Sequence, residues 1–291
     1  MIAGLELGGT KCVAILAGGP QRIAEWAVVP TTAPDETLGA LEAILDGWQF
    51  DAIGIASFGP LDLQRGSATY GHMAATPKAG WGGASLLPRF AARYGVPAAI
   101  QTDVEGAALA EGRWGAAQGL SDHVYITIGT GVGIGAIVAG RPVGGVMHGE
   151  AGHMRVGRRQ DDDFAGVCPF HGDCLEGLVS GPAIGARAGR SGAGVPDDDP
   201  IWQDVIDALA AGLHNLVLTL APARISIGGG VFAGRPALFP RLRNATARSL
   251  AGYGTVDAWL ASVDDRIGPP GLGDKAGPLG AIAVGLDALG A

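Results

Sequence analysis

The sequence predicts an α/β protein made of two lobes, and three observations support this prediction. The chain has 291 residues, which is more than one compact core usually holds. Two segments, which start at Ile2 and His123, each show a strand, a glycine-rich turn and a second strand. Amphipathic helices and short apolar runs follow both segments. We therefore expect two similar α/β lobes that face a cleft.

Each element of the two lobes follows from its local pattern. Apolar runs bounded by glycine or polar residues predict strands, and apolar residues at helical spacing predict helices. The strands are expected at 2–7, 12–17, 22–29, 52–57, 98–102, 123–128, 133–140 and 224–229. The helices are expected at 37–48, 86–95, 105–115, 205–222 and 277–290, with Pro222 ending the fourth. The expected domains are 1–103 and 104–276, with residues 277–291 packing back onto the first.

The composition excludes several classes of protein. Hydrophobic residues make up 47% of the chain and charged residues 16%, so global disorder is excluded. A net charge of -8 argues against nucleic acid or an anionic membrane as a partner. We find no spanning apolar run and no secretory leader. Three cysteines give no disulfide framework, so a cytoplasmic protein is expected.

Glycine clusters mark places where the backbone could approach a phosphate. The first is the turn Gly8, Gly9, Thr10 and Lys11, whose N–H groups could cradle phosphate oxygens, although an ordinary hairpin turn fits equally well. A second turn contains Thr130 and Gly131, and it opens the second half as the first turn opens the first half. The third cluster is Gly228, Gly229 and Gly230; taken alone, it favours a simple strand-to-helix turn. Two matched turns predict a pair of phosphate loops.

Asp103 lies where a strand gives way to a helix, and this position has two interpretations. An aspartate there commonly caps the helix N-terminus. A carboxylate at the end of a buried strand could also act as a general base that takes the proton of an attacking hydroxyl. The local sequence is compatible with both roles.

Cysteine and histidine gather in one loop of the second half. Cys168, His171 and Cys174 form C-x2-H-x2-C, and His153 precedes them by fifteen residues. Two thiolates and two imidazoles complete a tetrahedral zinc site with no open position, which is typical of a structural ion. Buried cysteines and ordinary histidines are the alternative. The loop is rich in glycine and proline and cannot build its own core, which favours zinc.

The ordered motifs of the chain resemble the ROK sugar kinases, most closely their bacterial fructokinase branch. These motifs are E-x-GGTK, TPKAGW, TDV, IGTGVG, GEAGH, CPFHGDCLEG and GGGV, and they run from Glu6 to about Gly280. The resemblance implies the two-lobed actin-like, hexokinase-like fold. It also implies an ATP-dependent phosphoryl transfer to a hexose, a structural zinc ion in the cysteine loop, and a homodimer.

The resemblance also implies roles for individual residues. Asp103 becomes the general base. Sugar contacts are assigned to Gly59, Thr102, Asp103, Glu150, His153 and Glu176. ATP contacts are assigned to Gly8, Gly9, Thr10, Lys11, Thr130, Gly131, Gly181, Pro182, Gly228, Gly229 and Gly230. Phosphoryl transfer requires a divalent ion, expected to be Mg²⁺, and Glu6 and Asp103 are the carboxylates expected near it.

Fructose, phosphorylated at its 6-hydroxyl, is the substrate that we expect. Glucose, mannose and N-acylated hexosamines are alternatives. A sugar-responsive repressor is a second hypothesis, but no helix-turn-helix is expected before the strand at Ile2. A non-catalytic sugar-binding protein is a third, and Asp103 together with two phosphate loops argues against it. Glu105 and Lys275 depart from the family pattern, which leaves their roles open.

Overall fold

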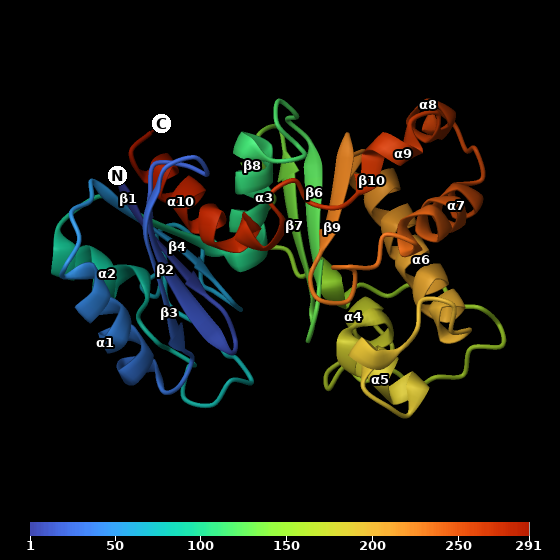
Figure 1. Cartoon of the computed structure of the whole chain (residues 1–291), viewed down its shortest axis with the longest axis horizontal. Coiled ribbons are helices and arrows are strands. Elements are labelled where there is room, and N and C mark those ends of the chain that lie inside the picture. Colours follow the sequence, from blue (N-terminus) through green and yellow to red (C-terminus); the bar gives the residue numbers. More distant parts are fainter. Residues whose placement is uncertain (291) are drawn as a thin grey trace. The chain divides into compact units, whose positions relative to one another are not determined.

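Two mixed β-sheets, each covered by helices, organise the chain in the computed structural model, which describes residues 1–290 (Figure 1). The first sheet has the order β3-β2-β1-β4-β5, and the second contains β7-β6-β9-β10. β1 runs antiparallel to β2 and parallel to β4, and β6 has the same relation to β7 and β9. The predicted duplication of the α/β lobe is therefore confirmed.

The residues group into two units. Unit 1 contains 1–119, 141–149 and 271–291, and unit 2 contains 120–140 and 150–270. The elements of unit 1 are β1 (Ile2–Leu7), β2 (Lys11–Ala17), β3 (Ile23–Pro30), α1 (Pro34–Leu45), β4 (Ala52–Ser57), α2 (Leu87–Tyr94), β5 (Ala98–Thr102), α3 (Asp103–Trp114), β8 (Arg141–Pro142), η3 (Gly273–Lys275) and α10 (Ala276–Ala288).

Alternation along β1 decides which side chains of unit 1 reach each face of its sheet. Leu5 and Leu7 join the core beneath α1 and α2, whereas Ile2 joins the core formed with α3 and α10. Glu6 therefore points to the α10 side of the sheet, between two core leucines. The pleat of a buried strand thus brings one carboxylate to the end of β1, beside the turn that starts at Gly8.

The elements of unit 2 are β6 (His123–Ile128), β7 (Val132–Val138), η1 (Ala151–His153), α4 (Leu175–Val179), α5 (Gly181–Ala188), η2 (Gly192–Gly194), α6 (Ile201–Leu220), β9 (Arg224–Gly228), α7 (Leu238–Leu250), α8 (Val256–Leu260), α9 (Val263–Arg266) and β10 (Ile267–Gly268). One hydrophobic core joins β6, β9, α4 and the long helix α6, whose Trp202 is fully buried. Among residues 1–290, no helix is long and apolar enough to cross a membrane.

The division of the chain differs from the expected boundary at residue 103. Helix α3 belongs to unit 1, because it packs closely on α10: a Cβ on Gly280 would lie 2.4 Å from the carbonyl carbon of Gly106. The buried carboxylate of Glu111 also accepts the N–H groups of Gly271 and Leu272, at 2.8 and 2.9 Å. These contacts tie α3 to the segment that leads into α10, so the first unit extends to residue 119.

Candidate active site

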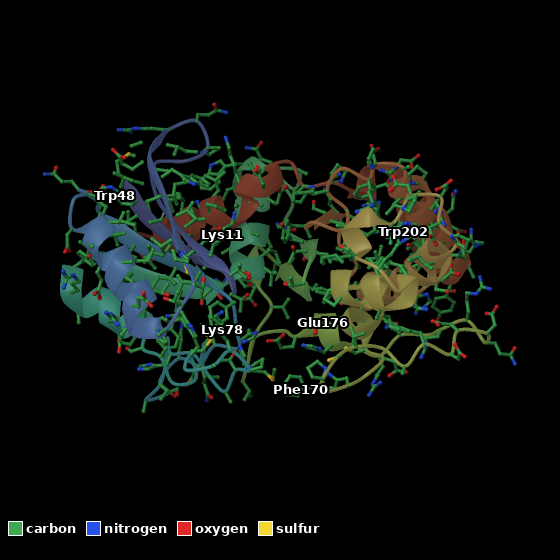
Figure 2. The ribbon with its side chains drawn as sticks, turned by 60° about the horizontal axis from the view of Figure 1, so that its bottom comes forward. Lys11, Trp48, Lys78, Phe170, Glu176 and Trp202 are labelled. Carbon is green, nitrogen blue, oxygen red and sulfur yellow. The ribbon has the colours of Figure 1, made fainter. Side chains whose placement is uncertain are left out.

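The turn between β1 and β2 is held by hydrogen bonds to its carbonyl groups. Thr31 Oγ1 donates to Gly8 O at 2.7 Å, and Thr31 N donates to Thr10 O at 3.0 Å. Lys78 Nζ donates to Gly9 O at 2.6 Å. Gly8 N closes the turn on Lys11 O at 3.1 Å. The conformation of the predicted phosphate loop is therefore fixed by neighbours in its own unit, and Figure 2 labels Lys11 and Lys78 there.

The N-cap of helix α3 is Thr102 rather than Asp103. The Thr102 side chain accepts the N–H of Glu105 at 3.2 Å. Asp103 is the first helical residue, and its carboxylate accepts the N–H of Val104 at 2.9 Å. Because Thr102 satisfies the capping position, the capping interpretation of Asp103 is wrong. The half-buried carboxylate of Asp103 lies in the first turn of α3, at the positive end of the helix dipole.

Glu6 shares the electrostatic environment of Asp103. Burial is the main cause that raises the pKa of Glu6, from 4.5 to about 7, and the negative charge of Asp103 raises it further. Lys11 acts in the opposite direction. The start of α10 covers the same carboxylate, since a Cβ on Gly277 would lie 1.9 Å from Glu6 Oε1. Two carboxylates and a lysine thus meet at the phosphate turn, where a cation would relieve their mutual repulsion.

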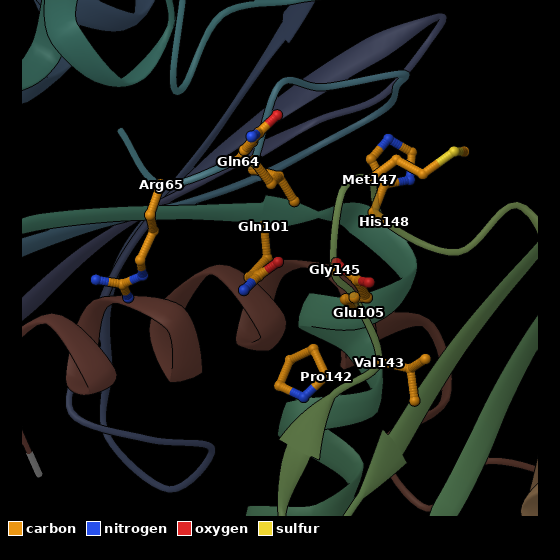
Figure 3. Close-up of a pocket in the computed structure, with 11 residues that line it drawn as sticks. Gln64, Arg65, Gln101, Glu105, Pro142, Val143, Gly145, Met147 and His148 are labelled. Carbon is orange, nitrogen blue, oxygen red and sulfur yellow. The ribbon is translucent and has the colours of Figure 1, made fainter. Parts of the chain in front are cut away.

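Unit 1 contains a pocket of about 420 Å³. Gln101 and Glu105, which flank Asp103 by two positions on either side, line it, as does the segment before Glu150 (Figure 3). His148 is buried at this wall, and its Nε2 accepts the N–H of Leu61 at 3.0 Å, so its proton resides on Nδ1. The imidazole of His148 therefore holds the backbone at Leu61, two residues after Gly59, which is predicted to contact the sugar.

The four predicted zinc ligands come together in unit 2. One ligand atom of each of His153, Cys168, His171 and Cys174 lies within 4.8 Å of the others. His153 Nδ1 is 3.6 Å from Cys168 Sγ and 3.5 Å from Cys174 Sγ, and His171 Nδ1 is 3.7 Å from Cys168 Sγ. Zinc–sulfur and zinc–nitrogen bonds of about 2.3 and 2.0 Å at the tetrahedral angle separate two ligand atoms by about 3.6 Å. The donor set and its spacing fit zinc.

The backbone of this loop is arranged to present the sulfur atoms. Cys168 N donates to Gly172 O at 3.1 Å, and Gly172 N donates back to Cys168 O at 2.9 Å. Leu175 N donates to Met154 O at 2.9 Å, which ties the start of α4 to the residue after His153. Burial raises the pKa of the Cys174 thiol to about 11. A bound cation would therefore be needed to hold this sulfur as a thiolate at neutral pH.

Glu176 connects the cysteine loop to the second glycine turn. Its Oε2 accepts the N–H of Val132 at 3.0 Å, and a Cβ on Gly131 would lie only 2.7 Å from that oxygen. Its Oε1 lies 3.9 Å from Nδ1 of His153 (Glu176 is labelled in Figure 2). Glu150 is exposed, and its carbonyl accepts the N–H of His153 at 2.9 Å. Contacts through His153 therefore bring Glu150, His153 and Glu176, three residues predicted to bind the sugar, close together.

The residues assigned to ATP in unit 2 also converge. Gly181 N donates to Gly129 O at 2.7 Å, which places the start of α5, with Pro182, against the turn that contains Thr130. Gly229 has a φ of 83°, and a Cβ there would lie 2.5 Å from the backbone of Ile128. Val231 N donates to Ile128 O at 2.9 Å. The third glycine cluster is therefore in contact with the second turn.

The predicted residues thus form two sets, one in each unit. Unit 1 holds Glu6, Gly8, Gly9, Thr10, Lys11, Gly59, Thr102 and Asp103, and unit 2 holds the others. The sequence did not predict the contact of Lys78 with Gly9. Its one indication was the position of Lys78 within the motif TPKAGW. The buried role of His148 was also missed, because a single histidine carries no pattern.

Comparison with known proteins places the chain in a family. The model of the ROK family matches residues 2–287. The chain is 39% identical to a fructokinase of Pediococcus pentosaceus over 99% of both chains. It is also 39% identical to a fructokinase of Zymomonas mobilis, over 98% of this chain and 96% of the relative.

Solved structures agree with this assignment and with the predicted fold. The ROK hexokinase from Thermus thermophilus matches with a TM-score of 0.78 and 28% identity, over 99% of both chains. A ROK family glucokinase from Streptomyces griseus, solved with glucose and AMPPNP, matches with a TM-score of 0.74 and 25% identity, over 98% of this chain and 99% of that one. The predicted actin-like sugar kinase fold is confirmed. This chain belongs to the ROK family.

Proposed function

We propose that the chain is an ATP-dependent hexose kinase that phosphorylates fructose at its 6-hydroxyl. The substrate assignment is supported by the two fructokinases that match nearly the whole chain. One local observation above the others supports the chemistry. The charges of Asp103 and Lys11 both act on the buried carboxylate of Glu6, beside the turn Gly8–Lys11.

In the proposed reaction, Asp103 accepts the proton of the sugar hydroxyl. The hydroxyl oxygen then forms a bond to the γ-phosphorus of ATP, while the bond between that phosphorus and the bridging oxygen breaks. The electron pair of the broken bond leaves with ADP. Asp103 suits this role because its carboxylate is half-buried, lies in the first turn of α3, and is spared from capping by Thr102.

We assign the phosphates to backbone N–H groups and to Lys11 at the first turn, and the sugar hydroxyls to Gly59, Thr102, Glu150, His153 and Glu176. Bound Mg²⁺ would neutralise phosphate charge, and Glu6 is the carboxylate that we expect near it. The raised pKa of Glu6 supports this, because a cation would favour its ionised form. Thr130, Gly131, Gly181, Pro182 and Gly228–Gly230 are assigned to the nucleotide.

We also propose that zinc, held by His153, Cys168, His171 and Cys174, is structural. Four protein ligands leave no open position for catalysis. Nδ1 of His153 faces the two sulfur atoms, so with zinc bound there its Nε2 would be the ring nitrogen left to donate to a sugar hydroxyl. Glu176 follows Cys174 by two residues, so a fixed loop also fixes this carboxylate. The homodimer and the cytoplasmic location stay predictions.

A panel of sugars tests the proposed function. ADP release from MgATP is measured with fructose, glucose, mannose and N-acetylmannosamine. We expect sugar-dependent ADP release that is fastest with fructose. A faster reaction with another hexose would retain the kinase and replace the substrate. No sugar-dependent release by folded, zinc-loaded protein would contradict the kinase assignment.

A further inference from the structure

The segment Thr76–Trp81 connects two predicted parts of the site within unit 1. Trp81 is fully buried, its Nε1 donates to Thr32 O at 2.9 Å, and its ring packs edge-on against Phe58. At the other end, Thr76 Oγ1 donates to Gly59 O at 3.4 Å, a long hydrogen bond. One end of the segment is therefore anchored in the core, and the other end contacts Gly59, which is predicted to bind the sugar.

Lys78 lies in the middle of this segment and reaches the phosphate turn. Its ammonium donates to Gly9 O at 2.6 Å, across 69 positions of sequence. A lysine ammonium has three N–H donors, so two remain after the contact with Gly9. None of the ion pairs found among residues 1–290 includes Lys78. The Lys78 residue is partly buried, and its ammonium is held on a neutral carbonyl at a contact exposed to solvent.

The use of lysine in this chain supports a specific role at this position. Of the 20 basic residues, three are lysines, namely Lys11, Lys78 and Lys275, and the rest are arginines. Two of these three lysines lie at the turn between β1 and β2. Arginine binds carboxylates and phosphates through its planar fork of donors, whereas lysine binds phosphate as a compact point charge on a flexible stem.

We propose that Lys78 is a catalytic residue whose ammonium contacts the terminal phosphate of ATP at the Gly8–Lys11 turn. The inference rests on the proposed function. Its two remaining N–H groups bind γ-phosphate oxygens while Gly9 O orients the ammonium. The charge neutralises the phosphoryl group as its bond to ADP breaks and its bond to the sugar oxygen forms. The anchored segment places this charge between Gly59, assigned to the sugar, and Gly9, assigned to ATP.

A purely structural clamp on the turn is the competing role, and the two roles differ in what they require. A clamp needs only one donor to Gly9 O, which a neutral side chain could provide. A clamp makes no use of the positive charge, whereas the terminal phosphate supplies an opposite charge for it. The ligand-binding role therefore accounts for the use of an ammonium.

Nucleotide binding separates these two roles. Calorimetry with Mg²⁺ compares AMPPNP with ADP for the wild type, Lys78→Met and Lys78→Arg. We expect Lys78→Met to bind AMPPNP roughly 10- to 100-fold more weakly, because a hydrogen bond to a charged group is lost. Its affinity for ADP should stay within about threefold, and kcat should fall by roughly 100-fold or more. Lys78→Arg should retain part of the AMPPNP affinity.

A matched control removes another positive charge from unit 1. Arg22→Met changes an exposed arginine in the β2–β3 turn and should leave both affinities unchanged. If Lys78→Met weakens AMPPNP and ADP equally and lowers the unfolding temperature, the residue is a clamp and the proposal is wrong. Unchanged AMPPNP affinity would also overturn it. Because binding is measured without turnover, wild-type protein that binds AMPPNP but phosphorylates no hexose would instead overturn the proposed function.

Discussion

The two glycine turns follow the same path in their sheets but differ in what surrounds them. In unit 1 the turn lies beside Glu6, Asp103 and two lysines, so charge dominates its surroundings. In unit 2 the residue that corresponds to Glu6, two positions before the first glycine, is Thr127. There the turn packs against Gly181, Gly229 and the Glu176 carboxylate.

This difference suggests a division of labour between duplicated elements. A shared strand–turn–strand places backbone N–H groups at the same edge of each sheet. The residues added around the turn then decide its chemistry. We infer that unit 1 supplies the charges used in phosphoryl transfer, and that unit 2 supplies a zinc-held loop and close backbone packing for recognition. The predictions below test each half of this comparison.

The largest effect is expected from Asp103→Asn in unit 1. Asparagine keeps the size of the side chain and an oxygen for the N–H of Val104, but it cannot accept the proton. We expect kcat to fall by roughly 100- to 10,000-fold, the range for loss of a general base. Fructose affinity in the absence of ATP, measured by calorimetry, should change little. An undiminished kcat would refute the role of Asp103.

Loss of zinc should act on recognition in unit 2 rather than on the chemistry. Cys174→Ala removes a buried ligand, so we expect elemental analysis to find no zinc in this variant and one zinc ion per wild-type chain. Fructose affinity should fall by roughly tenfold or more, because Glu176 and His153 lose their fixed positions. Cys12→Ala, a change of the cysteine outside the cluster, should keep the metal. Unchanged fructose affinity in verified metal-free protein would contradict the scaffold role.

The charge cluster of unit 1 should make stability depend on pH through Glu6. Its pKa is raised in the folded state to about 7, so the protonated form is favoured by folding. The resulting stability is fully present below pH 4.5 and is lost as the pH rises through about 7; the loss is at most about 3 kcal/mol. Urea unfolding without nucleotide measures the free energy of unfolding of Glu6→Gln minus that of the wild type. We expect this difference to be larger, in favour of the variant, at pH 8 than at pH 5. An equal difference at both pH values would show that Glu6 titrates normally.

The smallest effect is expected at the turn of unit 2. In Gly131→Ala the new methyl group would lie 2.7 Å from Glu176 Oε2, so the carboxylate must move away from the N–H of Val132. We expect the KM for fructose to rise by about tenfold, since a hydrogen bond to a charged group is disturbed. Gly39→Ala, where a Cβ meets nothing within 4 Å, is the control and should leave KM unchanged. If the two variants had the same KM for fructose, Glu176 would not contribute to sugar binding.

Much of the fold was predictable because its strands and long helices carry strong local patterns. The strands around the two glycine turns, helix α6 and helix α10 all lie where apolar periodicity places them. Helices α4, α5, α7, α8 and α9 were missed. Three of these, α4, α8 and α9, have five residues or fewer, and α7 has a polar, arginine-rich sequence that hides its apolar stripe.

The site was predictable where spacing itself carries chemistry, and less so where distant segments meet. The zinc ligands follow from the C-x2-H-x2-C spacing, and their atoms do converge. The contact between Lys78 and Gly9 depends on packing of Trp81 into the core, which no local pattern encodes. The domain boundary was displaced for the same reason, since α3 is held by contacts with residues beyond 270.

The identity of the product tests the central claim most directly. Wild-type protein is incubated with fructose and MgATP, and the sugar phosphate is identified by phosphorus and carbon NMR while ADP is quantified. We predict fructose 6-phosphate, formed in a 1:1 ratio with ADP and formed at least about 100-fold more slowly by Asp103→Asn. Phosphate on another hydroxyl, or ADP formed without any sugar phosphate, would contradict the account.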